Sequence, residues 1–169
     1  EGFQRAEFLL EKGATYGGKN DQIWAPYYTL HKILAGLLDS YEVGGSQKAL
    51  QIAQDMGLWV YQRLKVVPPA TRIQMWSRYI AGEYGGMNEV MADLAVLTGN
   101  RTFLTTAGYF DNTRLLADCA ANTDTLDGKH ANQHIPQIIG DLRMFEQGAS
   151  RDYRAAAAMI AGEDVTRLA

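Results

Sequence analysis

Residues 30–64 read LHKILAGLLDSYEVGGSQKALQIAQDMGLWVYQRL, and this stretch decides the fold class. Apolar residues recur every three or four positions on both sides of a glycine pair, Gly44 and Gly45, which is the spacing of one face of a helix. The glycine pair is typical of a helix end, and Ser46 after it is typical of the N-cap of a following helix. The stretch therefore predicts two helices joined by a short turn, an αα-hairpin.

The same plan recurs twice further along the chain. Residues 87–110 predict a second hairpin around Gly99, and residues 135–160 predict a third around Gly148, so that the turns repeat at a period of roughly 50 residues. Each hairpin leaves an apolar flank that only a neighbouring hairpin can cover. Three in a row predict an all-α fold of αα-hairpin repeats, either a solenoid or a segment of an (α/α) barrel (toroid). No long linker divides the chain, so residues 1–169 are expected to form a segment of a single domain.

Composition excludes several classes of function. The chain has 16 Lys and Arg against 19 Asp and Glu, a net charge of −3, and its basic residues are scattered. A basic face for nucleic acid or for a membrane surface is therefore not expected. The apolar share of 47% and the charged share of 21% are those of ordinary globular domains. No apolar run approaches the length of a membrane span. Localisation is left open.

Unusual polar and aromatic residues cluster where the first helix of each hairpin begins. The three clusters are Trp24, Tyr27, Tyr28 and His31; then Glu83, Tyr84, Gly85, Gly86, Asn88 and Glu89; then His130, Asn132, Gln133 and His134. Equal positions in stacked hairpins lie at the same end of the assembly, so the clusters are expected to converge. Aromatic rings beside amides, carboxylates and imidazoles suit a sugar. The pattern predicts a carbohydrate-binding site.

Each cluster also has a purely structural interpretation. Tyr27 and His31 lie one helical turn apart at the margin of an apolar stripe, as a hydrogen-bonded pair at the edge of the core would. Glu89 in a first helical turn complements the helix dipole without a catalytic role. Glu83 and Glu89 are the candidates for a glycosidase carboxylate pair, but acids are common at helix starts. The unusual residues recur at the same position in each of the three hairpins, and core packing does not require this. Their recurrence favours the binding-site hypothesis.

A metal site is not predicted within these residues. His130 and His134 would need further ligands to hold zinc, and the sequence supplies no obvious ones. The one cysteine, Cys119, lies among apolar residues, so we expect it to be buried and to have no catalytic role.

Three motifs resemble the signatures of the bacterial beta-L-arabinofuranosidase family, glycoside hydrolase family 127. They are WAPYYTLHKILAGLL at 24–38, EYGGMNEV at 83–90 and LDGKHANQHIP at 126–136, in the order and spacing of that family. The resemblance implies an (α/α)6 barrel whose helix-start loops line a sugar pocket. Together, repeat phase and resemblance predict these substrate-binding residues: Tyr27, His31, Glu83, Asn88, Glu89, His130, Asn132 and His134.

The resemblance also implies the family's chemistry, a retaining hydrolysis in which a zinc-bound cysteine thiolate attacks the anomeric carbon and a glutamate serves as acid and base. In the family those groups follow the third motif, and no adjacent-cysteine motif follows it here. We therefore expect a fragment of a longer enzyme that carries the pocket wall. No catalytic residue is assigned, and no cofactor is expected in this chain, zinc being implied for the complete family enzyme.

Two other classes of function stay open from the sequence. One is a helical-repeat interaction module, in which Trp24, Tyr27 and Trp76 would form a protein-binding groove. The other is a different toroid enzyme, such as a polysaccharide lyase, with Tyr28 or His31 as the base. The expected partner is a carbohydrate substrate, and an incomplete toroid would also self-associate through exposed helical edges.

Overall fold

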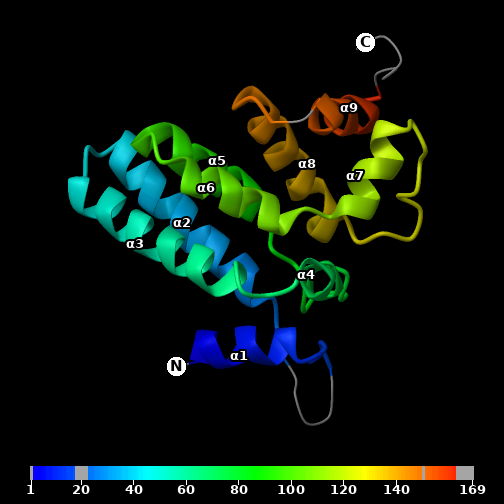
Figure 1. Ribbon diagram of the computed structural model, residues 1–169, viewed down its shortest axis with the longest axis horizontal. Coiled ribbons are helices and arrows are strands. Elements are labelled where there is room, and N and C mark those ends of the chain that lie inside the picture. Colours follow the sequence, from blue (N-terminus) through cyan, green and yellow to red (C-terminus); the bar gives the residue numbers. More distant parts are fainter. Residues whose placement is uncertain (1, 18–22, 150, 163–169) are drawn as a thin grey trace.

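The computed structural model describes residues 2–17, 23–149 and 151–162, which form helices joined by turns and loops (Figure 1). In chain order the elements are α1 Gly2–Glu11, α2 Pro26–Glu42, α3 Gln47–Leu64, α4 Pro69–Trp76, α5 Met87–Thr98, α6 Arg101–Ala107, the 3-10 helix η1 Gly108–Phe110, α7 Thr113–Ala120, α8 Ala131–Glu146 and α9 Arg151–Ile160. No β-strand occurs in these ranges, and none of their helices is long and apolar enough to cross a membrane. The predicted all-α class is confirmed.

The three predicted hairpins are α2–α3, α5–α6 and α8–α9, and the two helices of each pair pack together. Each turn contains one glycine with left-handed backbone: Gly45 at φ 69°, Gly99 at φ 68° and Gly148 at φ 82°. A residue with a Cβ atom would be strained at these positions. Ser46 caps α3 as predicted, because its hydroxyl accepts a backbone N–H at 3.3 Å. In the first turn, the left-handed residue is the second glycine of the pair, Gly45, and not Gly44.

The hairpins stack side by side in two rows of helices. In one row α2 packs against α5, and α5 packs against α8; in the other α3 packs against α6 (Figure 1). Gly57 lets α3 approach closely, since a Cβ atom there would lie 2.8 Å from Phe103 and 2.9 Å from Leu94. At the far end α9 packs on both α8 and α7. This double row of stacked hairpins is the architecture of a segment of an (α/α) toroid.

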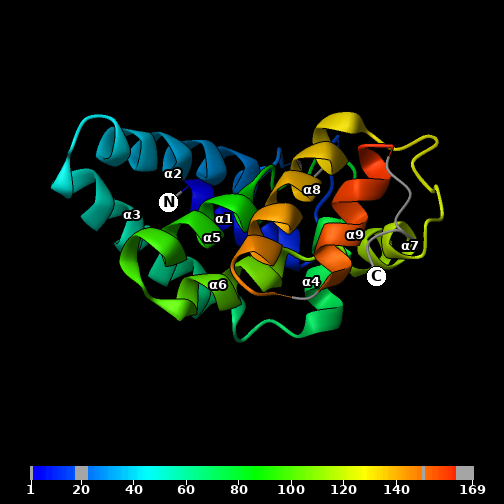
Figure 2. The ribbon, with the colours of Figure 1, turned by 90° about the horizontal axis from the view of Figure 1, so that it is seen from above.

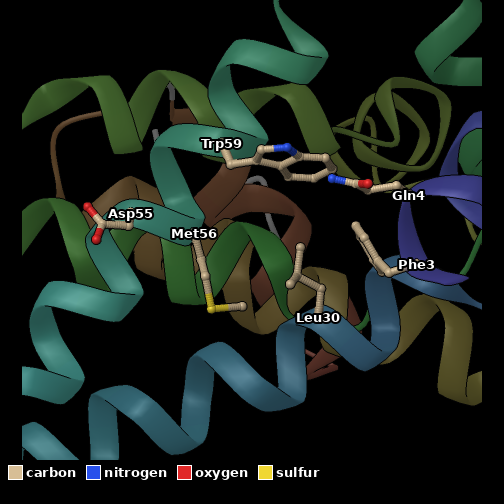
Figure 3. A pocket seen from close by; sticks show the side chains of 6 residues that line it. All are labelled: Phe3, Gln4, Leu30, Asp55, Met56 and Trp59. Atoms are coloured by element: carbon tan, nitrogen blue, oxygen red, sulfur yellow. The ribbon is translucent and has the colours of Figure 1, made fainter. Parts of the chain in front are cut away.

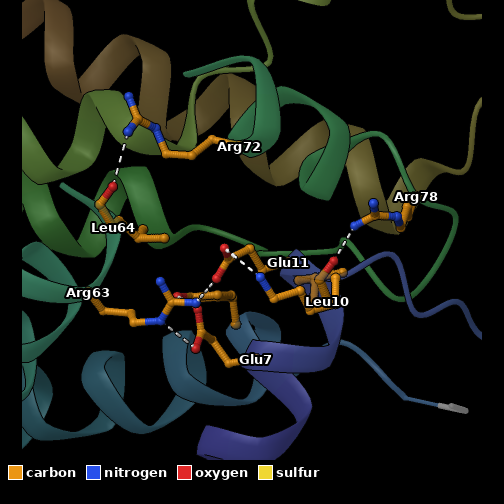
Figure 4. A network of polar contacts seen from close by, with 9 residues as sticks. Glu7, Leu10, Glu11, Arg63, Leu64, Arg72 and Arg78 are labelled. Carbon is orange, nitrogen blue, oxygen red and sulfur yellow. Dashed lines mark hydrogen bonds and ion pairs between the residues drawn. The ribbon is translucent and has the colours of Figure 1, made fainter. Parts of the chain in front are cut away.

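Three helices were not anticipated from the sequence: α1, α4 and α7. α1 is held by a charge network in which Arg63 of α3 contacts Glu7 with Nε 2.8 Å from Oε2, and also pairs with Glu11 (Figure 4). Arg78 donates a further hydrogen bond to the carbonyl of Leu10. α4 and α7 have eight residues each, too few for a periodic pattern to show.

The α8 helix buries a different face from the one its apolar pattern predicts. Of the apolar residues that recur there at helical spacing, Ile138 is buried, but Ile135, Ile139 and Leu142 are exposed, Ile139 to 53%. The buried face instead carries Gln133 and Asp141 among its polar residues. Their side chains form hydrogen bonds to α5 and to the segment after α4, and these bonds offset the cost of burying polar groups.

An aromatic cluster lies beneath the starts of α2, α5 and α8. Trp76 stands with its ring centroid 5.2 Å from Tyr27 and 5.0 Å from Phe110, and Tyr84 packs 5.4 Å from both Trp76 and Phe110. The indole N–H of Trp76 donates to a backbone carbonyl at 2.8 Å, so the polar atom of this buried ring is satisfied. This packed aromatic cluster supports the predicted site residues from the core side.

Candidate functional site

The starts of α2, α5 and α8 meet around the segment 76–86, as the repeat phase predicts (Figures 1 and 2). Gln133 in the first turn of α8 ties that helix to this segment, because its side-chain amide donates to the carbonyls of Trp76 at 3.1 Å and Arg78 at 3.2 Å. The start of α2 reaches the same segment through His31, which packs on Gly85 and Gly86. Residues from all three predicted clusters therefore contact a single loop.

The Gly85–Gly86 pair exists because His31 occupies the space that side chains would need. A Cβ atom on Gly85 would lie 2.5 Å from His31 Nδ1, and one on Gly86 would lie 3.0 Å from His31 Nε2. Gly85 also has a φ of 57°, which disfavours other residues. The glycines are thus more than a tight turn: they make room for the imidazole.

His31 is neutral at neutral pH. Burial, with a smaller contribution from the charge of Lys32, lowers the pKa of the imidazole to about 4. Its Nδ1 atom is buried and has no hydrogen-bond partner among the residues that the structure describes. A neutral imidazole carries one hydrogen-bond donor and one acceptor, so His31 can bind a hydroxyl group either as donor or as acceptor.

Glu89 lies beside His31. Its Oε2 atom would be 2.8 Å from a Cβ atom on Gly86, the same point that lies close to His31 Nε2. Burial raises the pKa of Glu89, the charge of Asp93 raises it further, and Arg143 and Lys32 oppose the shift. Glu89 also lines a hollow of about 280 Å³ between α5 and α8.

Glu83 and His130 form a second contact on the other side of the loop. His130 Nε2 lies 3.3 Å from Glu83 Oε1 as an ion pair, and this buried oxygen has no hydrogen-bond partner in the described part of the chain. Burial raises the pKa of Glu83, and the nearby His130 lowers it. Glu83 and Glu89, the candidate carboxylate pair, thus lie beside different histidines: Glu83 beside His130, and Glu89 beside His31.

Asn132 and His134 follow His130 in the first turn of α8. Asn132 is exposed, and His134 is half-buried with its Nδ1 atom 2.8 Å from the carbonyl oxygen of His130. Burial lowers the pKa of His134. Both residues stand at the rim of the same helix start.

Tyr27 and Asn88 lie in the interior, where each joins two helices. The Tyr27 hydroxyl donates to Glu7 Oε1 at 3.1 Å. The Asn88 amide donates to the Gln137 carbonyl at 2.8 Å and to Asp141 Oδ1 at 3.2 Å. Both side chains are fully buried. In this structure they support the site from behind and do not line it.

Two residues near the site were missed from the sequence. Tyr79 is an exposed aromatic residue whose ring stacks edge-on to His130 at 5.5 Å, and no periodic signal marks it. Asp141 lies buried behind Asn88, where burial and the charge of Asp111 raise its pKa to about 8. The only hint in the sequence that Asp141 is buried was its spacing: it lies three residues after Ile138, which places both on the same side of a helix.

The described part of the chain does not fit a zinc site. No group of three or more His, Cys, Asp or Glu side chains in it could hold a metal ion. Cys119 is fully buried as predicted, and it belongs to no group of three or more such side chains in the described residues. No catalytic step is assigned to zinc here.

Another hollow, of about 460 Å³, lies between α1, α2 and α3, away from these residues (Figure 3). Trp59 and Phe3 form much of its wall, with Asp55 and Gln4 at its rim. None of the predicted substrate-binding residues lines it. Its size alone does not make it the site, because the convergent polar groups lie at the helix starts.

The stacked hairpins and the polar residues at their helix starts define a protein of the (α/α)-toroid class. Residues 2–167 match the family model for the Beta-L-arabinofuranosidase, GH127 catalytic domain. Because that match covers nearly the whole chain, the chain belongs to this family of glycoside hydrolases, and the resemblance found from the three motifs is confirmed. A comparison with curated proteins finds no match. Carbohydrate is the substrate class that the domain implies.

Proposed function

We propose that this chain forms the substrate-binding wall of a glycoside hydrolase that acts on β-L-arabinofuranosides. The observation that carries the proposal is the packing of His31 and Glu89 around Gly85 and Gly86, with Glu83 and His130 on the other side of the same loop. Family membership supports a sugar as the ligand. Two polar atoms of this region, His31 Nδ1 and Glu83 Oε1, are buried without a hydrogen-bond partner among the described residues, and a sugar hydroxyl that reached either atom would satisfy it.

The electrostatics of the site suit a neutral sugar. His31 is uncharged at neutral pH, and the raised pKa values of Glu83 and Glu89 bring these acids closer to the protonated, hydrogen-bond-donating form. We assign the direct sugar contacts to these three residues and His130, with Asn132 and His134 at the rim. Tyr27 and Asn88 act through them as positioning residues.

We further propose that residues 1–169 alone do not hydrolyse the substrate. The family's chemistry uses a thiolate, and the single cysteine of this chain, Cys119, is buried with a raised thiol pKa. Turnover of an aryl β-L-arabinofuranoside by the purified chain would contradict this part of the proposal.

The interaction-module alternative required Trp24, Tyr27 and Trp76 to form a groove together, but of the three only Trp24 is exposed. The other two rings are buried in the aromatic cluster, so they form no such groove in this structure. We therefore put forward no second function.

A titration with methyl β-L-arabinofuranoside, followed by NMR chemical shifts, tests the binding proposal. The Gly86→Ala variant displaces the ends of the His31 and Glu89 side chains, and we expect about tenfold weaker binding from the loss of one or two hydrogen bonds. Gly36→Ala is the matched control, because a Cβ atom there meets nothing within 4 Å. The α-anomer controls for non-specific sugar binding. No saturable shift with the β-anomer, or equal affinities of the two variants, would refute the proposal.

A further inference from the structure

Two large exposed aromatic side chains are linked by ring contacts to residues of the proposed sugar site, Trp24 through Tyr28 to His31 and Tyr79 to His130. Trp24 is 56% exposed at the start of α2, and Tyr79 is 61% exposed between α4 and α5. A single exposed aromatic residue needs no explanation. These two are unusual in their ring contacts and in the backbone that holds them.

Trp24 connects to the site through a row of rings. Its ring centroid lies 6.2 Å from Tyr28, and Tyr28 lies 6.0 Å from His31, both edge to face. The residues on either side of Trp24, Ile23 and Ala25, are buried. The indole is therefore the one side chain of this short segment that faces outward.

Tyr79 connects to the other half of the site. Its ring contacts His130 at 5.5 Å, and His130 in turn contacts Glu83. The next residue, Ile80, is the centre of a tight turn, since the N–H of Ala81 donates to the carbonyl of Tyr79 at 2.6 Å. This turn fixes the backbone next to Tyr79, whose ring contacts His130.

Both exposed rings are followed directly by a strained residue. In the described residues the non-glycine positions with positive φ are Ala25 at 20°, Ile80 at 57° and Asn122 at 54°. Asparagine tolerates this region, but a β-branched isoleucine does not, and a residue before proline, as Ala25 is, disfavours helical backbone. Such strain persists only where the surrounding structure enforces it, and it concentrates at ligand sites.

We propose that Trp24 and Tyr79 are stacking surfaces for the sugar rings next to the bound arabinofuranosyl unit, so that the ligand is an oligosaccharide and not a single sugar. This inference rests on the proposed function. Aromatic faces bind the C–H surfaces of sugars, and a ring fixed before binding loses little conformational entropy when the sugar arrives. The segment that carries Tyr79 is fixed in this way, because the Gln133 amide holds the carbonyls of Trp76 and Arg78.

The test compares methyl β-L-arabinofuranoside with a β-L-arabinofuranosyl di- and trisaccharide, by calorimetric titration of the chain. We expect the trisaccharide to bind at least about tenfold more tightly than the methyl glycoside. Trp24→Ala and Tyr79→Ala should each weaken trisaccharide binding about five- to tenfold and leave the methyl glycoside unchanged. Trp24→Phe and Tyr79→Phe keep a ring and should keep most of the affinity.

Two further variants separate stacking from general effects. Phe8→Ala removes an equally exposed ring, 52% exposed on α1, and should change no affinity. Ile80→Gly relieves the strained turn and should weaken trisaccharide binding while the thermal midpoint stays equal or rises. Circular dichroism verifies the fold of every variant.

The outcomes distinguish the two proposals. If the methyl glycoside and the trisaccharide bind equally and neither alanine variant matters, the stacking inference is wrong while the sugar-binding function stands. If the chain binds none of the three ligands, the proposed function fails, and the stacking inference fails with it.

Discussion

Gly140 of α8 faces the side-chain amide of Asn88 on α5 so closely that a Cβ atom at position 140 would overlap it. The contact joins the second and third hairpins at a point where Asn88 also bonds to the Gln137 carbonyl and to Asp141. Asn88 is fully buried, so it cannot move into solvent to make space. The spacing between these two hairpins therefore depends on one glycine.

Gly140→Ala should destabilise the chain by about 2–4 kcal/mol, because overpacking adds to the loss of the Asn88 hydrogen bonds. Urea unfolding followed by circular dichroism measures the change. Gly36→Ala in α2 is the control, where the added methyl meets nothing within 4 Å. There we expect a gain of about 0.5–1 kcal/mol from helix propensity. A Gly140→Ala variant as stable as the parent would show that the α5–α8 contact is wrongly placed.

Asp141 should make the folded chain less stable as the pH rises. Burial raises the pKa of Asp141 from 3.8 to about 8, so the unfolded chain releases this proton at much lower pH than the folded chain. Stability from this group is present at the acid end, falls as the pH rises between those two values, and is fully lost above the folded pKa. Asp111, whose pKa burial raises to about 6, contributes in the same direction.

Asp141→Asn removes the titrating proton but keeps an oxygen that accepts from Asn88. The urea midpoint of this variant should therefore fall less between pH 5 and pH 8 than the midpoint of the parent. This pH window follows from the raised pKa of Asp141, which is about 8. Tyr153, which donates to Asp111 at 2.7 Å, is unchanged in this variant. Identical pH slopes in the two proteins would mean that Asp141 titrates normally.

Arg63→Met should release α1 from the rest of the fold. Glu7 is buried, and without the guanidinium its carboxylate would be left uncompensated, at a cost of about 3 kcal/mol or more. Amide hydrogen exchange should speed up in α1 and stay slow in α5 and α8. Lys12→Met removes an exposed partner of Glu11 and should have little effect. Equal protection of α1 in both variants would contradict the clamp shown in Figure 4.

Self-association through a helical edge stays a prediction, and the exposed stripe of Ile135, Ile139 and Leu142 on α8 is where we expect it. Sedimentation velocity at increasing concentration should show a rising sedimentation coefficient, and Ile139→Glu should abolish that rise. Val43→Glu, at an exposed position at the end of α2, serves as the control. A sedimentation coefficient of the parent chain that does not change with concentration would contradict self-association.

Much of the fold could be predicted from the sequence, because its signals act over a few residues. Gly99 and Gly148 end helices through their own backbone freedom, and Ser46 caps α3 with its own side chain. The helices that were missed depend on distant partners. α1, for example, is held by Arg63, more than fifty residues away, and no local pattern reports such a contact.

The site residues stay a prediction, but the sequence did indicate which polar clusters lie near one another. Repeat phase alone placed the three polar clusters at one end, and the structure brings them to one loop. The apolar pattern misassigned the buried face of α8, because hydrogen bonds from Gln133 and Asp141 outweigh the hydrophobic preference of Ile135 and Ile139 there.

The sequence by itself determined the turns of the three hairpins and that the hairpins share one plan, since the Ser46 cap and the left-handed glycines act locally. Only the tertiary structure decided which polar groups are sealed between helices. Asn88 and Glu89 are neighbours in the chain, yet the first is sealed between α5 and α8 while the second lies beside His31 at the loop. A side chain's exposure depends on the helix that packs against it, and that helix can come from any part of the chain.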